Sequence, residues 1–161
     1  MSDLTQEQIT EYYHRSYKTV DGLWFVKAEE KFGFETAMEI DTEVWKVIPK
    51  IQARLLQQML NLDKGMEALK ECFSKKLELD GFKFNTEPLP DNSGFLVKIS
   101  SCPWYELRVK SGRENLFKGY DDRICSTEFK VFAKEFGEKI TFGYQIQLCK
   151  GGECCILQFS Q

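Results

Sequence analysis

Histidine is almost absent from this sequence. His14 is the single histidine among 161 residues, which removes most Ser-His-Asp, Cys-His and multi-histidine metal arrangements. The chain also contains no Cys-x-x-Cys pair, so the spacing of a zinc ribbon is missing. Any chemistry must therefore use Cys, Asp, Glu, Lys, Arg or Tyr side chains, or a bound cofactor.

Long apolar runs are missing as well. No stretch approaches the roughly 20 apolar residues that cross a bilayer, and residues 1–5 lack the basic start and apolar segment of a signal peptide. A net charge of -3 and a pI near 5.4 argue against a large nucleic-acid-binding surface. We therefore expect a cytoplasmic protein with no membrane span and no nucleic-acid partner.

Aromatic residues are plentiful. They make up 14% of the chain, with 13 Phe, and hydrophobic residues make up 42% against 29% charged residues. This balance is typical of a folded protein with a ring-rich core or pocket. The length suits one domain, and we expect a single compact domain over residues 1–161.

The first half of the chain has a helical period. We expect a helix from about Thr5 to Tyr17, a short break at Asp21-Gly22, and a further helix that ends at Gly33. A strong pattern beginning near residue 36 places Ile40, Val44, Ile48, Ile51, Leu55 and Met59 on one face. Pro49 should kink this helix or divide it in two. Another helix is expected over residues 63–79.

The second half changes to a period of two. Alternating apolar residues predict strands near 82–84, 95–99, 140–148 and 155–159, the last two joined by a turn at 150–153. A short helix should begin at Pro103, and a longer one should cover about 121–136. The fold class is therefore α+β, with N-terminal helices (1–80) packed on a C-terminal antiparallel sheet with inserted helices (81–161).

Cysteine is the most informative residue type. The chain contains six cysteines and no export signal, so we expect reduced thiols. Cys72 fits core packing, whereas Cys149 and Cys154 flank the turn and suit surface or edge positions. The remaining cysteines fall at the ends of predicted elements, where folds gather site residues and where a helix start lowers a thiol pKa: Cys102, Cys125 and Cys155. The alternative is that these cysteines are small buried hydrophobes.

The segments around these cysteines resemble a known family. Three segments are similar to the L-2-amino-thiazoline-4-carboxylic acid hydrolase-like family. They are Cys-Pro-Trp-Tyr at 102–105, Ile-Cys-Ser-Thr-Glu-Phe at 124–129 and Gly-Gly-Glu-Cys-Cys-Ile-Leu-Gln-Phe at 151–159. The resemblance covers about residues 94–160. Glu128 stands where members often have Asp, and Cys154 replaces their usual His. The first eighty residues look like an uncharacterised prokaryotic subgroup, and the wider fold is similar to 4-vinyl reductase-type ligand-binding domains.

The resemblance implies two kinds of chemistry. In a hydrolase of a cyclic C–N bond, Cys125 would be the nucleophile and Glu128 its base, although Glu128 would also raise the pKa of that thiol. In a metal site, Cys102, Cys125 and Cys155 would be ligands to zinc or iron, with Glu128 as a fourth ligand or base. The Cys102-Pro103 pair also has the look of some haem-thiolate sites, a weaker alternative.

A carboxylate-bearing ligand would need cations and a planar surface. Lys50 and Arg54 lie one helical turn apart and could bind the carboxylate, or else form a solvated basic face. Trp24 and Trp104 could line the ligand pocket together with Trp45, or else belong to the core. The long helix around Trp45 and an aromatic surface are compatible with a homodimer.

The sequence thus favours a small ligand- or metal-binding protein with a cysteine-rich pocket. One alternative is a hydrolase of a cyclic amidine or thiazoline C–N bond. A second is a sensor or assembly protein whose cysteines are purely structural. A nucleophile paired with a proper base would separate the first two, and the sequence offers only Glu128 as that base.

Overall fold

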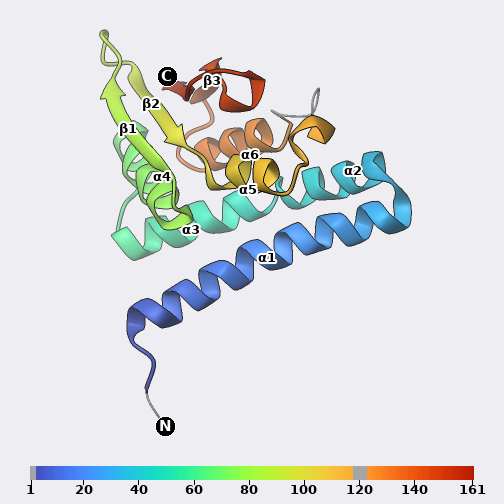
Figure 1. Cartoon of the computed structure of the whole chain (residues 1–161). Coiled ribbons are helices and arrows are strands. Elements are labelled where there is room, and N and C mark those ends of the chain that lie inside the picture. Colours follow the sequence, from blue (N-terminus) through green and yellow to red (C-terminus); the bar gives the residue numbers. More distant parts are fainter. Residues whose placement is uncertain (1–2, 118–122) are drawn as a thin grey trace. The chain divides into compact units, whose positions relative to one another are not determined.

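The computed structural model describes residues 3–117 and 123–161, and it confirms an α+β fold (Figure 1). Helices dominate the first half, and the strands all lie in the second half. The chain forms two compact units, residues 1–43 and 44–161. The expectation of one domain over the whole chain stays a prediction.

The N-terminal unit is built from α1 (Gln6–Phe32) and most of α2 (Phe34–Val44). Thr5 caps α1, because its hydroxyl accepts a hydrogen bond from the Gln8 amide while the Gln8 side chain accepts one from the Thr5 amide. Gly33, with a φ of 84°, ends the helix. The predicted break at Asp21-Gly22 is wrong, since α1 runs through it; one interior glycine costs only about 1 kcal/mol.

The second unit contributes the remaining helices. Pro49 lies in the first turn of α3, so it separates α2 from α3 as one of the two predicted outcomes. Pro103 likewise starts α5, as expected. The bounds are α3 (Ile48–Leu60), α4 (Met66–Asp80), α5 (Pro103–Lys110), the 3-10 helix η1 (Glu114–Phe117) and α6 (Arg123–Lys134).

The sheet has four antiparallel strands in the order β1-β2-β4-β3. The strands are β1 (Lys83–Pro88), β2 (Gly94–Ser101), β3 (Thr141–Ile146) and β4 (Cys155–Ser160). Each outer strand carries one register shift, between Lys83 and Phe84 in β1 and between Tyr144 and Ile146 in β3. The strand expected over 140–148 ends earlier, because residues 148–150 form the short 3-10 helix η2 (Leu148–Lys150).

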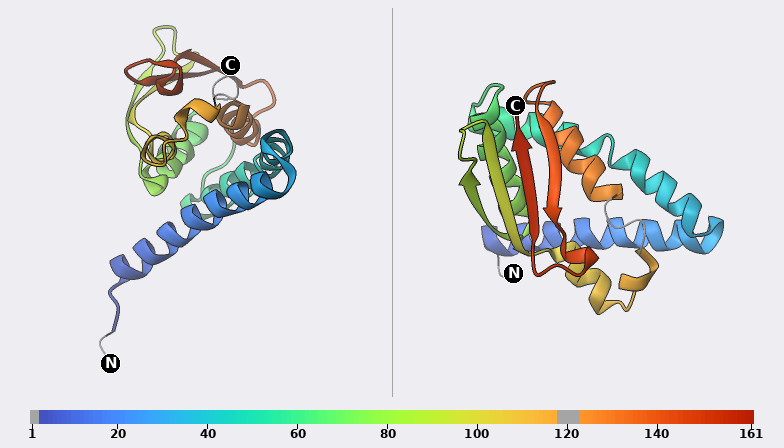
Figure 2. Two further views of the ribbon diagram at one scale, coloured as in Figure 1. Left: turned by 45° about the vertical axis from the view of Figure 1, so that its right-hand side comes forward. Right: turned by 90° about the horizontal axis from the view of Figure 1, so that it is seen from above.

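Helices cover one face of this sheet (Figure 2). Helix α4 contacts β1, helix α6 contacts β3, and α3 packs against both helices. Phe73 of α4 lies at the centre, with its ring 4.8–5.7 Å from the rings of Phe129, Phe132 and Phe159. The core of the second unit is thus a layer of phenylalanine rings between helices and sheet, which confirms the expectation of a ring-rich core.

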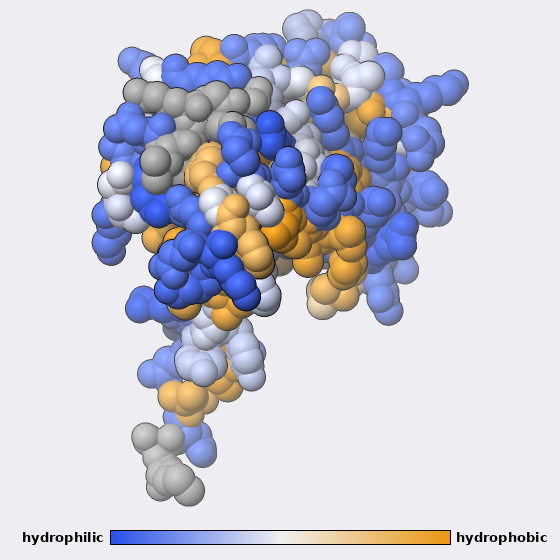
Figure 3. Space-filling model, turned by 90° about the vertical axis from the view of Figure 1, so that its right-hand side faces the viewer, coloured by the Kyte–Doolittle hydropathy of each residue, from blue (hydrophilic) through white to orange (hydrophobic). Residues whose placement is uncertain are grey.

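The apolar face predicted for the long helix is not the face that α3 buries. Pro49, Ala53 and Leu56 are the buried residues of α3, whereas Ile51, Leu55 and Met59 are 56%, 47% and 69% exposed. Figure 3 shows hydrophobic side chains lying among hydrophilic ones on the face it displays. In the part of the chain that the structure describes, none of the helices has both the length and the apolar character needed to span a bilayer.

Candidate functional site

The ends of β2 and β4 bring two cysteines together. Ile99 of β2 is paired with Cys155, the first residue of β4. Cys102 follows β2 directly and is the N-cap of α5. The backbone therefore places Cys102 and Cys155 at the same end of the sheet, as their predicted positions at element ends required.

Cys125 and Tyr144 complete this cluster. Cys125 lies in the first turn of α6, the helix that contacts β3, and Tyr144 lies on β3. Burial is the main reason that the pKa values of Cys125 and Tyr144 are raised, and smaller upward contributions come from the charge of Cys102 on Cys125 and from those of Cys125 and Cys155 on Tyr144. All four side chains pack against the hydrophobic core. We call Cys102, Cys125, Cys155 and Tyr144 the thiol cluster.

The thiols of the cluster are protonated at neutral pH. Burial raises the pKa of Cys102 to about 11, and burial followed by the charge of Glu128 raises the pKa of Cys125 well above its ordinary value. Burial also raises the pKa of Cys155. The expectation that a helix start lowers these thiol pKa values is wrong, because desolvation of the thiolate outweighs the helix dipole.

Backbone amides hold two of the sulfur atoms in place. The Tyr105 amide donates to Cys102 Sγ at 3.5 Å, and the Leu148 amide donates to Cys155 Sγ at 3.2 Å. Arg108 of α5 also acts on the cluster, because its charge lowers the pKa of each thiol, by less than burial raises it. Two of the three sulfur atoms are thus held by backbone amides, and the charge of Arg108 acts on all three.

The other cysteines lie outside the cluster. Cys72 is fully buried in the core, as predicted. Cys154 is also buried, so its assignment to the surface or a sheet edge is wrong. Cys149 is partly buried, as are the three cysteines of the cluster. All six cysteines are free thiols in the structure.

Glu128, the expected base, is held in a buried ion triad that the sequence did not reveal. Lys76 of α4 contacts Glu128 Oε1 at 2.5 Å and Asp80 Oδ2 at 2.6 Å, and the Lys76 side chain is 3% exposed. Burial lowers the pKa of Lys76, but the charges of Glu128 and Asp80 raise it by more, so the net shift is upward. Glu128 therefore faces a permanent cation as well as the thiol cluster.

The thiols are not arranged as a ready metal site. Within residues 3–117 and 123–161, no three His, Cys, Asp or Glu side chains stand in positions that could hold a metal ion. The three cysteines predicted as ligands are near enough for the charge of Cys155 to raise the pKa of Cys102, and for that of Cys102 to raise the pKa of Cys125, in each case by less than burial does.

Of the two predicted carboxylate-binding cations, Arg54 is engaged elsewhere. Its Nε and Nη2 donate to the Glu135 carboxylate at 2.7 Å and 3.4 Å. This pair joins α3 to the residue that follows α6, and it raises the pKa of Arg54. Lys50 is exposed on the same helix. Neither residue lies in the thiol cluster.

The predicted tryptophans fall in different places. Trp24 lies on α1 in the N-terminal unit and is 72% exposed. Trp104 of α5 meets Trp45 edge to face, with ring centroids 6.3 Å apart. Of the three tryptophans, Trp104 is nearest in sequence to a cysteine of the cluster, because it follows Cys102 by two residues. A ligand-binding role for either tryptophan stays a prediction.

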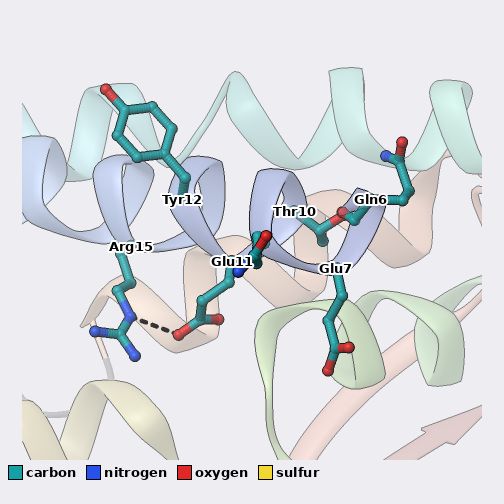
Figure 4. A pocket seen from close by; sticks show the side chains of 7 residues that line it. Gln6, Glu7, Thr10, Glu11, Tyr12 and Arg15 are labelled. Atoms are coloured by element: carbon teal, nitrogen blue, oxygen red, sulfur yellow. Dashed lines mark hydrogen bonds and ion pairs between the residues drawn. The ribbon is translucent and has the colours of Figure 1, made fainter. Parts of the chain in front are cut away.

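Two surface depressions lie away from the cysteines of the thiol cluster. The first is lined by residues of α1 alone, and Figure 4 shows Tyr12 and Glu7 pointing to opposite sides of that helix. The ion pair between Arg15 and Glu11 crosses its surface. The second lies along β3 and β4 and includes Tyr144, but its other lining residues are mainly polar side chains of the sheet. Neither depression is lined by Cys102, Cys125 or Cys155.

The fold and cluster together define an α+β protein with a partly buried thiol cluster beside a buried ion triad. The chain belongs to the family described as "Family of unknown function (DUF6125)", whose model matches residues 2–150. No curated protein and no solved structure is detectably similar to the chain. Its likeness to the thiazoline-hydrolase-like family stays a prediction.

Proposed function

We propose that this protein binds a thiophilic metal ion through Cys102, Cys125 and Cys155, with Zn²⁺ as the ion that suits the donors. The proposal is supported by the position of these three cysteines, at the N-cap of α5, in the first turn of α6 and at the start of β4, where all three pack against the same core. Thiolates are soft ligands that favour zinc over calcium or magnesium. Binding would turn the sulfur atoms toward one ion and release their protons, so the affinity would fall as the pH falls.

The same geometry favours binding over hydrolysis. A nucleophilic thiol needs a lowered pKa or an adjacent base. Burial and Glu128 raise the pKa of Cys125, and Lys76 already holds the Glu128 carboxylate. A thiol that is protonated at neutral pH is a weak nucleophile, and a carboxylate that is paired with a lysine is a weak base, so the two are poorly suited to attack a C–N bond. A metal ion, in contrast, deprotonates the thiols that bind it.

Metal titration of the reduced full-length chain tests the proposal. Zn²⁺ should bind with near-stoichiometric occupancy, and Cd²⁺ should produce the thiolate-to-metal charge-transfer absorption that reports sulfur ligands. Cys102→Ser, Cys125→Ser and Cys155→Ser should each remove most of the affinity. Cys72→Ala is the matched control, because it removes a buried thiol that lies outside the cluster.

Two results would contradict the proposal. One is a wild-type chain that binds neither ion. The other is a Cys72→Ala variant that loses as much affinity as the cluster variants, which would show that the loss reflects unfolding.

A further inference from the structure

Helix α1 exposes a row of large apolar side chains. Tyr13, Tyr17, Val20 and Trp24 follow one another at steps of four, three and four residues, the spacing that forms the seam of a coiled coil. They are 67%, 38%, 55% and 72% exposed. We call these four residues the α1 seam. Single exposed apolar residues are normal on a protein surface, but a contiguous row of them is typical of an interaction site.

The N-terminal unit has only a small core of its own. Among its described residues, the buried side chains of α1 and α2 are Ala28, Ala37 and Met38, and the rings of Phe25 and Phe34 meet edge to face at 5.8 Å. A helical hairpin of this size usually needs further support, such as oligomerisation, to be stable. The α1 seam is the apolar surface that a partner of this unit would cover.

The exposed area around the seam matches what a dimer needs. A buried aromatic side chain covers about 150–250 Å², so Tyr13 and Trp24 each leave about 100–180 Å² in contact with water. Tyr12 and Leu23 flank the seam on the same side of α1 and are 66% and 53% exposed. The seam and these two residues together would bury about 600 Å², most of the about 800 Å² that each partner contributes to a standard protein–protein interface.

The polar residues that continue the seam select the orientation of the partner helix. The same steps of four and three lead back to Thr10 and Gln6 and forward to Lys27 and Lys31. In a parallel pair, Lys27 and Lys31 would each face their own copy, and like charges facing each other across a seam repel. In an antiparallel pair centred on the seam, Lys27 lies opposite Thr10 and Lys31 opposite Gln6, which are uncharged.

We propose that the α1 seam is the interface of a homodimer in which α1 packs antiparallel against α1 of a second copy. Tyr13 of each chain then lies against Trp24 of the other, and Tyr17 against Val20. The same patch is used on both chains, so the contact closes with two-fold symmetry and does not extend into a filament. The thiol cluster takes no part in this contact, so the dimer is independent of metal binding.

Light scattering of the reduced full-length chain over a range of concentrations tests the proposal. The mass should rise from 18.8 kDa toward twice that value as the concentration increases. Trp24→Ala should raise the dissociation constant of the dimer by at least about 30-fold, as truncation of a central aromatic anchor does. Its circular dichroism should stay helical, because alanine is the best helix former. Met59→Ala is the matched control, because Met59 is an apolar residue of α3 that is 69% exposed and lies outside the seam.

Chemical cross-linking tests the orientation. In an antiparallel dimer, Thr10 lies opposite Lys27 of the other chain, and the two copies of Thr10 lie about 25 Å apart at 1.5 Å per residue. A short bismaleimide should therefore link a mixture of Thr10→Cys and Lys27→Cys chains, and it should leave Thr10→Cys alone at the background level of the wild type.

Three results would overturn the proposal. One is a wild-type chain that stays monomeric up to its solubility limit. Another is a Met59→Ala variant that weakens the dimer as much as Trp24→Ala does, because the interface would then not be confined to the α1 seam. The third is efficient cross-linking of Thr10→Cys alone, which would show a parallel pair. None of these results bears on the metal site, which is tested separately by Zn²⁺ titration.

Discussion

Replacing Lys76 by methionine would leave two carboxylates in the core without their cation. The Lys76, Glu128 and Asp80 side chains are 3%, 8% and 15% exposed, so water compensates little for the lost charge. Breaking a buried ion pair by removing one partner typically costs about 3–5 kcal/mol. Small domains have a total stability of about 5–15 kcal/mol. We therefore expect Lys76→Met to lose a large part of the free energy of unfolding.

The pH dependence of this contribution has a definite sign. The pKa of Lys76 is raised in the folded chain: burial lowers it, but Glu128 and Asp80 raise it by more. A raised lysine pKa stabilises the fold at every pH below the unfolded value of about 10.4 and is lost only as the pH rises through the folded pKa. The effect of Lys76→Met should therefore be fully present at neutral pH, and the contribution of the lysine should be lost in strongly alkaline solution.

Urea unfolding, followed by circular dichroism, measures the effect. Lys75→Met is a matched control on the neighbouring residue, because Lys75 forms an ion pair of the same length with Glu78 at the surface. Exposed pairs contribute about 0–1 kcal/mol, so this variant should stay close to the wild type. The double variant Lys76→Met/Glu128→Gln should recover part of the loss, since it also removes one stranded charge.

Equal stabilities of Lys76→Met and Lys75→Met would refute the reasoning. So would a double variant that is less stable than Lys76→Met, because it would show that Glu128 stabilises the fold independently of the lysine. Either result would mean that α4 and α6 are held together by the phenylalanine core without a contribution from the triad.

Two further predictions concern the sheet and the thiols. Gly94→Ala should strongly lower the stability of the fold in urea, because a Cβ at Gly94 would lie 1.9 Å from the Phe159 carbonyl oxygen. Gly143→Ala is the control and should be tolerated, because no atom lies within 4 Å of a Cβ at that position. Equal losses of stability in the two variants would contradict the β2–β4 pairing. In metal-free protein, iodoacetamide should alkylate Cys102 slowly near neutral pH, and the rate should keep rising with pH up to the pKa of this thiol, about 11. A rate that levels off near pH 8.5, about the ordinary thiol pKa, would contradict the conclusion that burial raises the pKa.

Local patterns predicted much of this fold. The change from a helical period to a period of two separated the helices from the sheet. Pro49 lies where the predicted long helix is divided, one of its two expected effects, and Pro103 starts α5 as expected. The cysteines at 102, 125 and 155 lie at the element ends where they were expected. These features depend on neighbouring residues, which a sequence displays directly.

Features that depend on distant residues were missed. Lys76 lies on the buried face of α4 beside Phe73 and Leu77, and a charged residue on an apolar helical face was a signal that could have been read. Its partner Glu128, however, is 52 positions away in the sequence, and only the packing of α4 beside α6 brings them together. The thiol pKa values were misjudged for the same reason, since burial depends on tertiary structure.

The irregular register of both outer strands has a consequence for assembly. A sheet edge offers unpaired amides and carbonyls on which another chain can build. In β1 the ladder is offset after Lys83, and in β3 it is offset after Tyr144. A straight incoming strand would match only part of either edge before its hydrogen bonds fell out of phase. The two offsets therefore shorten the regular part of each border of the sheet, to residues 84–88 in β1 and 141–144 in β3.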